Sequence, residues 1–365
     1  MHKFFINFKE KNIANQTRLI QINPVVQFLY IMKSDVNIKS IAEALGISIS
    51  TVSRALQNNP KIGLKTRELV FEKAKELRYV PNPASMFLKG KKMFVVGIIV
   101  PALDEEFFSK VINTVEDFFE KHGYQVFVFQ TRNDMLRQDN ALEIMLKYRV
   151  DGLLVSLAAN TTEYAKFKKV EDFGIPTVFF DRVPRSYKAH KIRCDIQKGA
   201  VDAIGFLKQL NCKRIALING PSNLDASDER LNGYLLGLQK NNIRSSQSLI
   251  KSCDLTKQGA MSVMDEFLSQ ESVPDAIFGF NDYVALYAML VCKKRGIVPN
   301  QEIKFVGYGN LPISDLMSNP PLASVEQFPE KTGLQAAQLL LSIIDNQVRI
   351  DNYKEMIVET KLVVH

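Results

Sequence analysis

The stretch from residue 37 to residue 58, NIKSIAEALGISISTVSRALQN, constrains the fold more than any other part of the chain. Its first half carries one apolar stripe at helical spacing, formed by Ile38, Ile41, Ala42 and Leu45. Gly46 follows directly, and glycine adopts the left-handed backbone conformation that ends a helix at little cost. The pattern therefore predicts a short helix that stops at a sharp turn.

A second short helix is predicted directly after this turn. Ser48 stands at its N-cap, where a serine hydroxyl accepts a hydrogen bond from the first-turn N–H groups. The apolar face is expected to continue through Val52, Ala55 and Leu56. The outer face is expected to carry Ile49, Ser50, Ser53 and Arg54. Such a pair can be an ordinary helical hairpin, but it also matches the unit that places its second helix in the major groove of DNA.

A third helix and a basic segment follow this pair. The pattern predicts a helix at 64–77, with an inner face of Leu69, Val70, Ala74 and Leu77. The segment RYVPNPASMFLKGKK comes next, at residues 78–92. The run from Ile49 to Lys92 resembles the DNA-binding headpiece and hinge of the LacI/GalR family of bacterial transcription regulators. The motifs TVSR, KTR and YVPN and the hinge leucine occur together at the spacing of that family.

The resemblance implies roles for the side chains of the second helix. Ile49 and Ser50 match the two positions that most often set operator specificity in the family. Ile49 offers only apolar contact, for instance with a thymine methyl group, whereas Ser50 can exchange one hydrogen bond. Thr51 and Ser53 match positions that bind phosphates. Arg54 is long and cationic, so it suits a guanine or a phosphate.

The hinge is expected to run from Asn82 to Gly90. Pro81 and Pro83 interrupt any continuation of the third helix, since proline lacks the backbone N–H that a helix needs. Leu88 matches the leucine that family members insert into the minor groove. The residues expected to contact DNA are therefore Ser48, Ile49, Ser50, Thr51, Ser53, Arg54, Asn82 and Leu88.

The distribution of charge supports a nucleic-acid partner. The net charge is +8, and residues 33–92 hold 12 Lys and Arg against 5 Asp and Glu. Residues 1–32 hold 4 against 1, which leaves residues 93–365 close to neutral. A basic segment that coincides with the helical pair indicates contact with phosphates rather than a merely solvated surface.

From residue 94 onward, short apolar runs alternate with longer helical stretches. Buried strands are predicted at 94–100, 124–130, 152–157, 176–181, 214–220, 276–280 and 304–309. Helices are predicted at 106–122, 136–148, 162–173, 198–209, 227–240, 256–269 and 282–295. This alternation indicates parallel sheets covered on both faces, and its restart after Cys194 indicates two similar α/β subdomains.

This part of the chain resembles the periplasmic-binding-protein-like sensor of the same family. The predicted fold class is a helical helix-turn-helix headpiece, joined by a hinge helix to an α/β sensor of two Rossmann-like parallel-sheet subdomains. The expected domains are the helix-turn-helix domain at 32–79, the hinge at 80–92 and an effector-binding and dimerisation domain at 93–365. Because that fold crosses between subdomains three times, the first is expected to hold about 93–192 and 323–346, and the second about 194–321 and 350–365.

A small-molecule effector is expected between the subdomains, at the carboxyl ends of the strands. Residues at predicted strand ends and helix starts match cleft positions of the family, namely Phe107, Asp181, Arg182, Arg230, Asn281 and Asp282. Their carboxylate, guanidinium, amide and aromatic groups suit a sugar, although such residues can also be purely structural.

Two departures from the family pattern bear on the effector. Gly309 stands where the family often has an aspartate, and Leu255 stands about where several relatives have an aromatic ring. The chain also has no tryptophan. A simple neutral hexose is therefore not firmly implied, and Arg182 with Arg230 would accept an acidic sugar.

Other classes of function find little support in the sequence. The four cysteines are scattered without a C-x-x-C pair, which predicts reduced thiols and neither a zinc site nor disulfides. The motifs G-x-x-x-x-G-K-[ST], H-E-x-x-H and G-x-S-x-G are absent, so we predict no catalytic residues and no cofactor. A run of 18 apolar residues, as a membrane span would need, is also absent.

Residues 1–31 stand apart from this scheme. They are basic and contain FFINF and VVQFLYI, without an uninterrupted apolar core followed by a small-residue cleavage site. Met32 begins a sequence that resembles a family N-terminus. Residues 1–31 are therefore expected to be a disordered extension or the product of a misassigned start. An amphipathic membrane-surface helix is the competing interpretation, and Pro24 interrupts its periodicity.

Together these features predict a cytoplasmic, nucleoid-associated transcription regulator, and they favour a repressor over an activator. It is expected to bind a near-palindromic DNA operator as a homodimer, without a membrane partner, under the control of a sugar or sugar derivative. Induction and co-repression both remain open. The alternative is a solute-binding protein of a transport system, which would suit the fold but would leave the basic headpiece unexplained.

Overall fold

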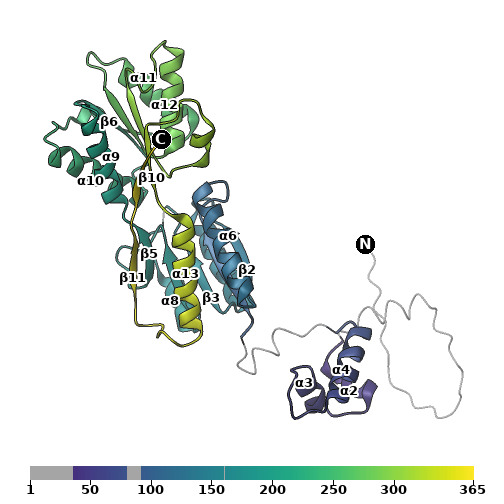
Figure 1. Ribbon diagram of the computed structural model, residues 1–365. Helices are drawn as coiled ribbons and strands as arrows, with labels where there is room; N and C mark the ends of the chain where they lie inside the picture. The colour runs from purple at the N-terminus through teal and green to yellow at the C-terminus, as the bar shows by residue number, and fades with distance from the viewer. Residues whose placement is uncertain (1–35, 80–91, 160) are drawn as a thin grey trace, which may run out of the picture. The chain divides into compact units, whose positions relative to one another are not determined.

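The computed structural model describes residues 36–79, 92–159 and 161–365. The chain divides into two compact units, Met1–Lys91 and Lys92–His365, which we call the headpiece and the sensor (Figure 1). The predicted hinge residues Asn82 and Leu88, like the predicted extension at 1–31, lie outside the described residues.

The headpiece contains α2 (Ile38–Leu45), α3 (Ile49–Ala55) and α4 (Leu64–Glu76). Asn37 caps α2 by accepting hydrogen bonds from two backbone N–H groups of the first turn. Gly46 ends α2 with φ of 63°, in the left-handed region that glycine adopts without steric cost. The predicted helix, turn and helix are therefore confirmed.

One small core holds the three headpiece helices together. Its buried members are Ile41, Ala42, Val52, Ala55, Val70 and Ala74. The expected inward position of Leu69 is wrong, because that side chain is 47% exposed. Successive residues on a helix lie about 100° apart, so Val70 occupies the buried face and turns its neighbour toward solvent.

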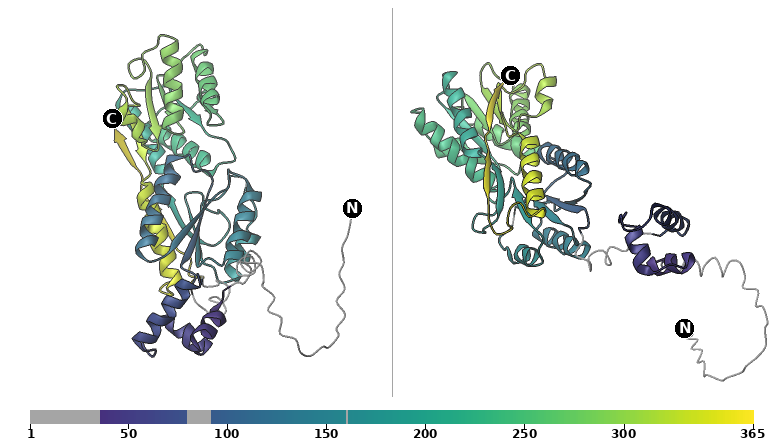
Figure 2. Two further views of the ribbon diagram at one scale, coloured as in Figure 1. Left: turned by 90° about the vertical axis from the view of Figure 1, so that its right-hand side faces the viewer. Right: turned by 60° about the horizontal axis from the view of Figure 1, so that its bottom comes forward.

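The first sheet of the sensor has six parallel strands in the order β11-β5-β4-β3-β1-β2. Its strands are β1 (Val95–Val100), β2 (Gln125–Gln130), β3 (Gly152–Val155), β4 (Thr177–Phe180), β5 (His190–Cys194) and β11 (Glu355–Val358). Its helices are α6 (Glu106–Lys121), α7 (Met135–Tyr148), α8 (Ala165–Asp172) and α13 (Pro329–Ile344). α6 and α13 lie side by side against this sheet (Figures 1 and 2).

The second sheet has the order β12-β10-β9-β8-β6-β7, and β12 alone among these strands runs antiparallel to its neighbour. Its strands are β6 (Ile215–Asn219), β7 (Ile250–Ser252), β8 (Ala276–Gly279), β9 (Lys304–Tyr308), β10 (Ala323–Glu326) and β12 (Lys361–Val364). Its helices are α9 (Ile196–Gln209), α10 (Asp225–Lys240), α11 (Lys257–Leu268) and α12 (Asp282–Lys294), with short 3-10 turns η1 (Gln247–Leu249) and η2 (Pro312–Leu316).

The chain passes between the two sheets after β5, after β10 and after β11. Three crossings were expected, but the expected boundaries need correction at two strands. β10 belongs to the second sheet rather than to the first subdomain, and β11 belongs to the first sheet rather than to the second subdomain. Both strands have four residues, and the choice of sheet depends on long-range backbone pairing that no local pattern records.

Within the described residues, we find no helix long and apolar enough to cross a lipid bilayer.

Candidate DNA-binding and effector-binding sites

The N-terminus of α3 presents a set of exposed side chains. Ser48 caps the helix by accepting a hydrogen bond from the Thr51 backbone N–H at 3.1 Å. The Ser48 hydroxyl also lies 2.8 Å from the hydroxyl oxygens of both Ser50 and Thr51. Ile49 is 51% exposed, between these hydroxyl groups. The first turn of α3 therefore offers an apolar side chain flanked by pre-positioned hydroxyl groups.

Farther along the same helix, Arg54 is exposed and lies in the last turn. Ser53 is half-buried, and its hydroxyl accepts a hydrogen bond from the Gln57 side chain at 3.3 Å. The structure thus places the six predicted contact residues of this helix and its cap on one short element, while Val52 and Ala55 anchor the opposite face in the headpiece core. Apolar, hydroxyl and guanidinium groups on one helix are the chemistry that reads base edges and binds phosphates.

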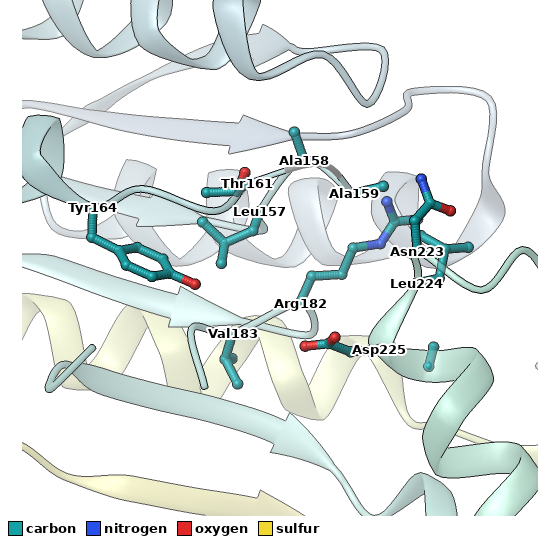
Figure 3. A pocket seen from close by; sticks show the side chains of 11 residues that line it. Leu157, Ala158, Ala159, Thr161, Tyr164, Arg182, Val183, Asn223, Leu224 and Asp225 are labelled. Carbon is teal, nitrogen blue, oxygen red and sulfur yellow. The ribbon is translucent and has the colours of Figure 1, made fainter. Parts of the chain in front are cut away.

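The sensor has a cavity between its two subdomains (Figure 3). The first subdomain contributes residues after β3 and β4, and the second contributes the loop before α10 and the start of that helix. The lining residues are Leu157, Ala158, Ala159, Thr161, Tyr164, Arg182, Val183, Asn223, Leu224, Asp225 and Ala226. The cavity volume is about 60 Å³, well below the roughly 300 Å³ at the lower end of small-ligand pockets. A sugar would therefore need its two walls to separate.

Arg182 is the predicted effector-binding residue that lines this cavity, and Figure 3 shows its side chain extending toward Asn223. Its guanidinium donates a hydrogen bond to the Asn133 side chain. It also lies 3.7 Å from a carboxylate oxygen of Glu105 and 3.9 Å from one of Asp181. Nearby acceptors therefore hold Arg182 in place and offset its positive charge.

Asp181 connects this wall of the cavity to the interior. Its backbone adopts φ of 56°, which is unusual for a residue with a side chain and turns the chain sharply after β4. The carboxylate accepts one long hydrogen bond, from the Ser156 hydroxyl at 3.4 Å. Burial raises the pKa of Asp181, and the positive charges of Arg182 and Arg230 act against that rise.

Arg230 lies on α10 and is buried between two aromatic rings. Its guanidinium carbon is 4.1 Å from the ring centroids of both Phe280 and Tyr308, which is the geometry of cation–π contact. One terminal nitrogen donates to the Ala226 carbonyl at 3.1 Å, and the buried Nε atom has no partner among the described residues. Burial lowers the pKa of Arg230.

Asn281 is the N-cap of α12 and Asp282 is its first residue, and the side chains of both make hydrogen bonds within the protein. The Asn281 side chain caps the helix by accepting a hydrogen bond from the Val284 N–H at 2.9 Å. The buried Asp282 carboxylate accepts hydrogen bonds from the Ser324 hydroxyl at 2.6 Å and the Leu311 N–H at 2.7 Å. Burial raises the pKa of Asp282. Asp282 thus links α12 to β10 and to the segment before η2.

Phe107 is half-buried at the start of α6 and packs against the main core of the sensor. Its ring meets that of Phe108 edge to face, with centroids 5.4 Å apart. Of the predicted effector set, the structure places Arg182 on the cavity wall, buries Arg230 and leaves Asp181 half-buried, and Asp181 and Arg230 each act on the other's pKa.

Sequence reasoning missed several residues of the cavity wall, notably Thr161, Tyr164, Asn223 and Asp225. These residues follow the carboxyl ends of β3 and β6, where ligands bind in open α/β sheets. All loops that follow the carboxyl ends of the predicted strands are candidates for the cavity wall, not only the charged residues directly at the strand ends.

The described residues contain no group of three or more His, Cys, Asp or Glu side chains placed to hold a metal ion. The four cysteines are free and buried.

Two family models match the chain in succession. The model described as bacterial regulatory proteins of the lacI family matches residues 37–82. The model described as periplasmic binding proteins and sugar binding domain of the LacI family matches residues 93–361, which is more than half of the chain.

Similar proteins are regulators rather than enzymes. The transcriptional repressor PurR of Vibrio atlanticus (strain LGP32) is 29% identical, over 89% of this chain and 98% of its own length. The transcriptional repressor CytR of Escherichia coli (strain K12) is 26% identical, over 85% of this chain and 90% of its own.

Solved structures agree with this comparison. The lac repressor dimer bound to operator and an anti-inducer has a TM-score of 0.78 at 24% identity, over 90% of this chain and 98% of that one, and supports the fold. The complex of the regulator CelR with cellobiose has a TM-score of 0.67 at 25% identity, over the same shares of the two chains. The chain thus belongs to the LacI family of bacterial regulatory proteins, with a helix-turn-helix headpiece and a periplasmic-binding-protein-like sensor.

Proposed function

We propose that this protein is a transcriptional repressor that binds a near-palindromic operator as a homodimer. A sugar or sugar derivative in the cavity of the sensor controls its affinity for the operator. The observation that carries this proposal is the surface of α3, where exposed hydroxyl, apolar and guanidinium groups share one capped helix in a basic headpiece. Its site of action would be the cytoplasm, at the nucleoid.

Each predicted contact residue of α3 and its cap has a chemically suitable partner on DNA. Ile49 would contact a thymine methyl group, and the Ser50 hydroxyl would bond to a base edge. Thr51 and Ser53 would bind phosphates, together with the cap residue Ser48. Arg54 would bind a guanine or a phosphate. In the hinge segment, we propose that Asn82 contacts the DNA backbone and that Leu88 enters the minor groove.

The short length of the DNA-reading helix α3 supports the proposed dimer. One helix as short as α3, with seven residues, reads one half-site, and helix-turn-helix proteins gain affinity by presenting two such helices one helical turn of DNA apart. The similar lac repressor structure is described as a dimer on its operator. Two copies related by a twofold axis would select an approximate palindrome.

For the effector, the charges near the cavity favour an uncharged polyhydroxyl compound over an anion. Carboxylates accompany both arginines: Asp181 and Glu105 lie beside Arg182, and Asp181 also acts on Arg230. Hydroxyl groups of a sugar can bond to such acceptors and donors without adding net charge. The complex of CelR with cellobiose supports the same class of compound.

A thermal-shift measurement tests the effector class. Neutral mono- and disaccharides, nucleosides and acidic sugars are added separately to the full chain and to the variant Arg182→Met, which removes the guanidinium from the cavity wall. We expect a neutral compound to raise the melting temperature of the parent protein by several degrees and to lose at least tenfold in affinity for the variant. Stabilisation by acidic sugars alone would overturn the assignment.

A further inference from the structure

Next to residues of the cavity wall, one side chain of the first subdomain makes ion pairs with the second. Arg185 lies in the loop between β4 and β5, two residues after Val183 of the cavity wall. Its Nη2 atom is 2.7 Å from a carboxylate oxygen of Asp225 and 3.0 Å from one of Asp228. Both carboxylates stand in the first turn of α10, and Asp225 itself lines the cavity. We call these three residues the Arg185 bridge.

The loop that carries Arg185 is firmly attached to the first subdomain on both sides. Before it, Pro184 is buried and its carbonyl accepts a hydrogen bond from the Lys191 side chain. After it, the ring of Tyr187 stacks on Tyr164 of the cavity wall, with centroids 5.3 Å apart and planes 13° from parallel. The backbone of Arg185 is therefore held in place on the first subdomain, and formation of the ion pairs orders only its side chain.

The carboxylates move with the second subdomain, because they belong to α10. Asp225 and Asp228 also stand at the N-terminus of this helix, where the helix dipole stabilises negative charge. They would therefore remain in a favourable setting after the ion pairs break. This arrangement makes the bridge reversible rather than essential for folding.

We propose that the Arg185 bridge holds the two sensor subdomains together beside the cavity and that its release lets the cavity open to admit the effector. The cavity of about 60 Å³ is too small for a sugar, so entry requires the walls to separate. The three side chains are 61%, 47% and 50% exposed, so salt screens their attraction. The claim that the cavity admits an effector rests on the proposed function. The claim that the Arg185 bridge holds the two subdomains together does not.

The test measures the distance between the subdomains in the full chain without any ligand. Spin labels are attached at Lys169→Cys on α8 and Gln239→Cys on α10, both exposed positions, while the native cysteines are buried. Pulsed electron paramagnetic resonance then gives the distance distribution for the labelled parent, for Arg185→Gln and for Asp225→Asn with Asp228→Asn. The control is Arg295→Gln, which breaks an exposed Arg–Asp pair inside the second subdomain at 2.6 Å.

We expect Arg185→Gln and the double Asn variant to raise the ratio of long to short distances about fivefold in 0.1 M salt, as loss of about 1 kcal/mol implies. In 1 M salt, where the Debye length is about 3 Å, the parent should approach the variants. The reversed pair, Arg185→Asp with Asp225→Arg and Asp228→Arg, should restore part of the short-distance population, because the helix dipole disfavours arginine at the start of α10. The control should match the parent.

Equal distributions for the parent and Arg185→Gln at both salt concentrations would overturn the bridge. This result leaves the proposed function standing if a sugar still changes the operator affinity of the same variant. Conversely, a shifted distribution in a protein that binds neither operator nor sugar would support the bridge and reject the proposed function.

Discussion

At the scale of single residues, some polar side chains inside the sensor hold its elements together, whereas others remain able to bind an effector. Asp282 matched a family cleft position, but its two short hydrogen bonds join α12 to β10 and to the segment before η2. Arg230 keeps an unpartnered Nε among the described residues, and Asp181 accepts a single long hydrogen bond. An unsatisfied buried group costs free energy, so the Arg230 Nε atom has bonding capacity left for an effector, as does the half-buried Asp181 carboxylate.

His190 makes folding of the sensor depend on pH. Its Nδ1 atom accepts a hydrogen bond from the Lys354 backbone N–H at 3.2 Å, which requires the neutral ring, and its Nε2 atom lies 3.1 Å from the Ile350 carbonyl. Burial lowers the pKa of His190 from its ordinary value of 6.5, and the charge of Lys354 acts in the same direction. Between the lowered and the ordinary pKa the unfolded chain binds more protons, so stability is lost as pH falls below about 6.5.

We expect the variant His190→Gln to lose less free energy of unfolding between pH 7 and pH 5 than the parent protein, whatever its stability at pH 7. Urea unfolding curves at both pH values measure the two losses. The control variant is His122→Gln, which replaces an exposed histidine by the same residue. Identical losses in His190→Gln and the parent would contradict this role.

At the scale of elements, local signals predicted helices and strands well but not their pairing. α9 begins at Ile196 because Asp195 caps it, two residues before the predicted start. β5 and β7 were not predicted, since HKIRC mixes charged and apolar residues and β7 has three residues. Such strands are specified by hydrogen bonds to a neighbouring strand rather than by their own composition.

In the candidate sites, too, features decided by local sequence could be predicted and features decided by long-range contacts could not. The exposed face of α3 could be predicted because helical periodicity and a cap decide it locally. On the cavity wall, Arg182 was predicted, but Tyr164, Asn223 and Asp225 were not, because segments distant in sequence meet there only after folding. The ion pairs of Arg185 span about forty residues of chain and have no local signature.

The cap of α3 gives a prediction about this element. Ser48→Ala removes the acceptor for the Thr51 N–H, which should lower the local stability of α3 by about 1 kcal/mol. Hydrogen exchange of the α3 amides in the full chain measures this loss as about fivefold faster exchange. Ser53→Ala, on the same helix but outside the cap, should change the exchange less. Equal effects of both variants would show that the cap is unimportant.

At the scale of the whole molecule, a basic headpiece and a nearly neutral sensor divide the work of binding DNA and sensing a small molecule. Phosphate contacts give salt-dependent affinity without sequence preference, and base contacts give specificity. An operator-binding regulator needs both kinds of contact, because it must distinguish one operator from a large excess of other DNA.

The most direct test is selection of bound duplexes from a random DNA pool by the full chain, followed by sequencing and by titration of the recovered duplex. We expect an approximate palindrome, bound at least about 10³-fold more tightly than a scrambled duplex of the same composition at equal salt. Arg54→Ala should lower that ratio. Binding of both duplexes with the same salt-sensitive affinity, in the presence and absence of a sugar that stabilises the sensor, would contradict the assignment as an operator-binding repressor.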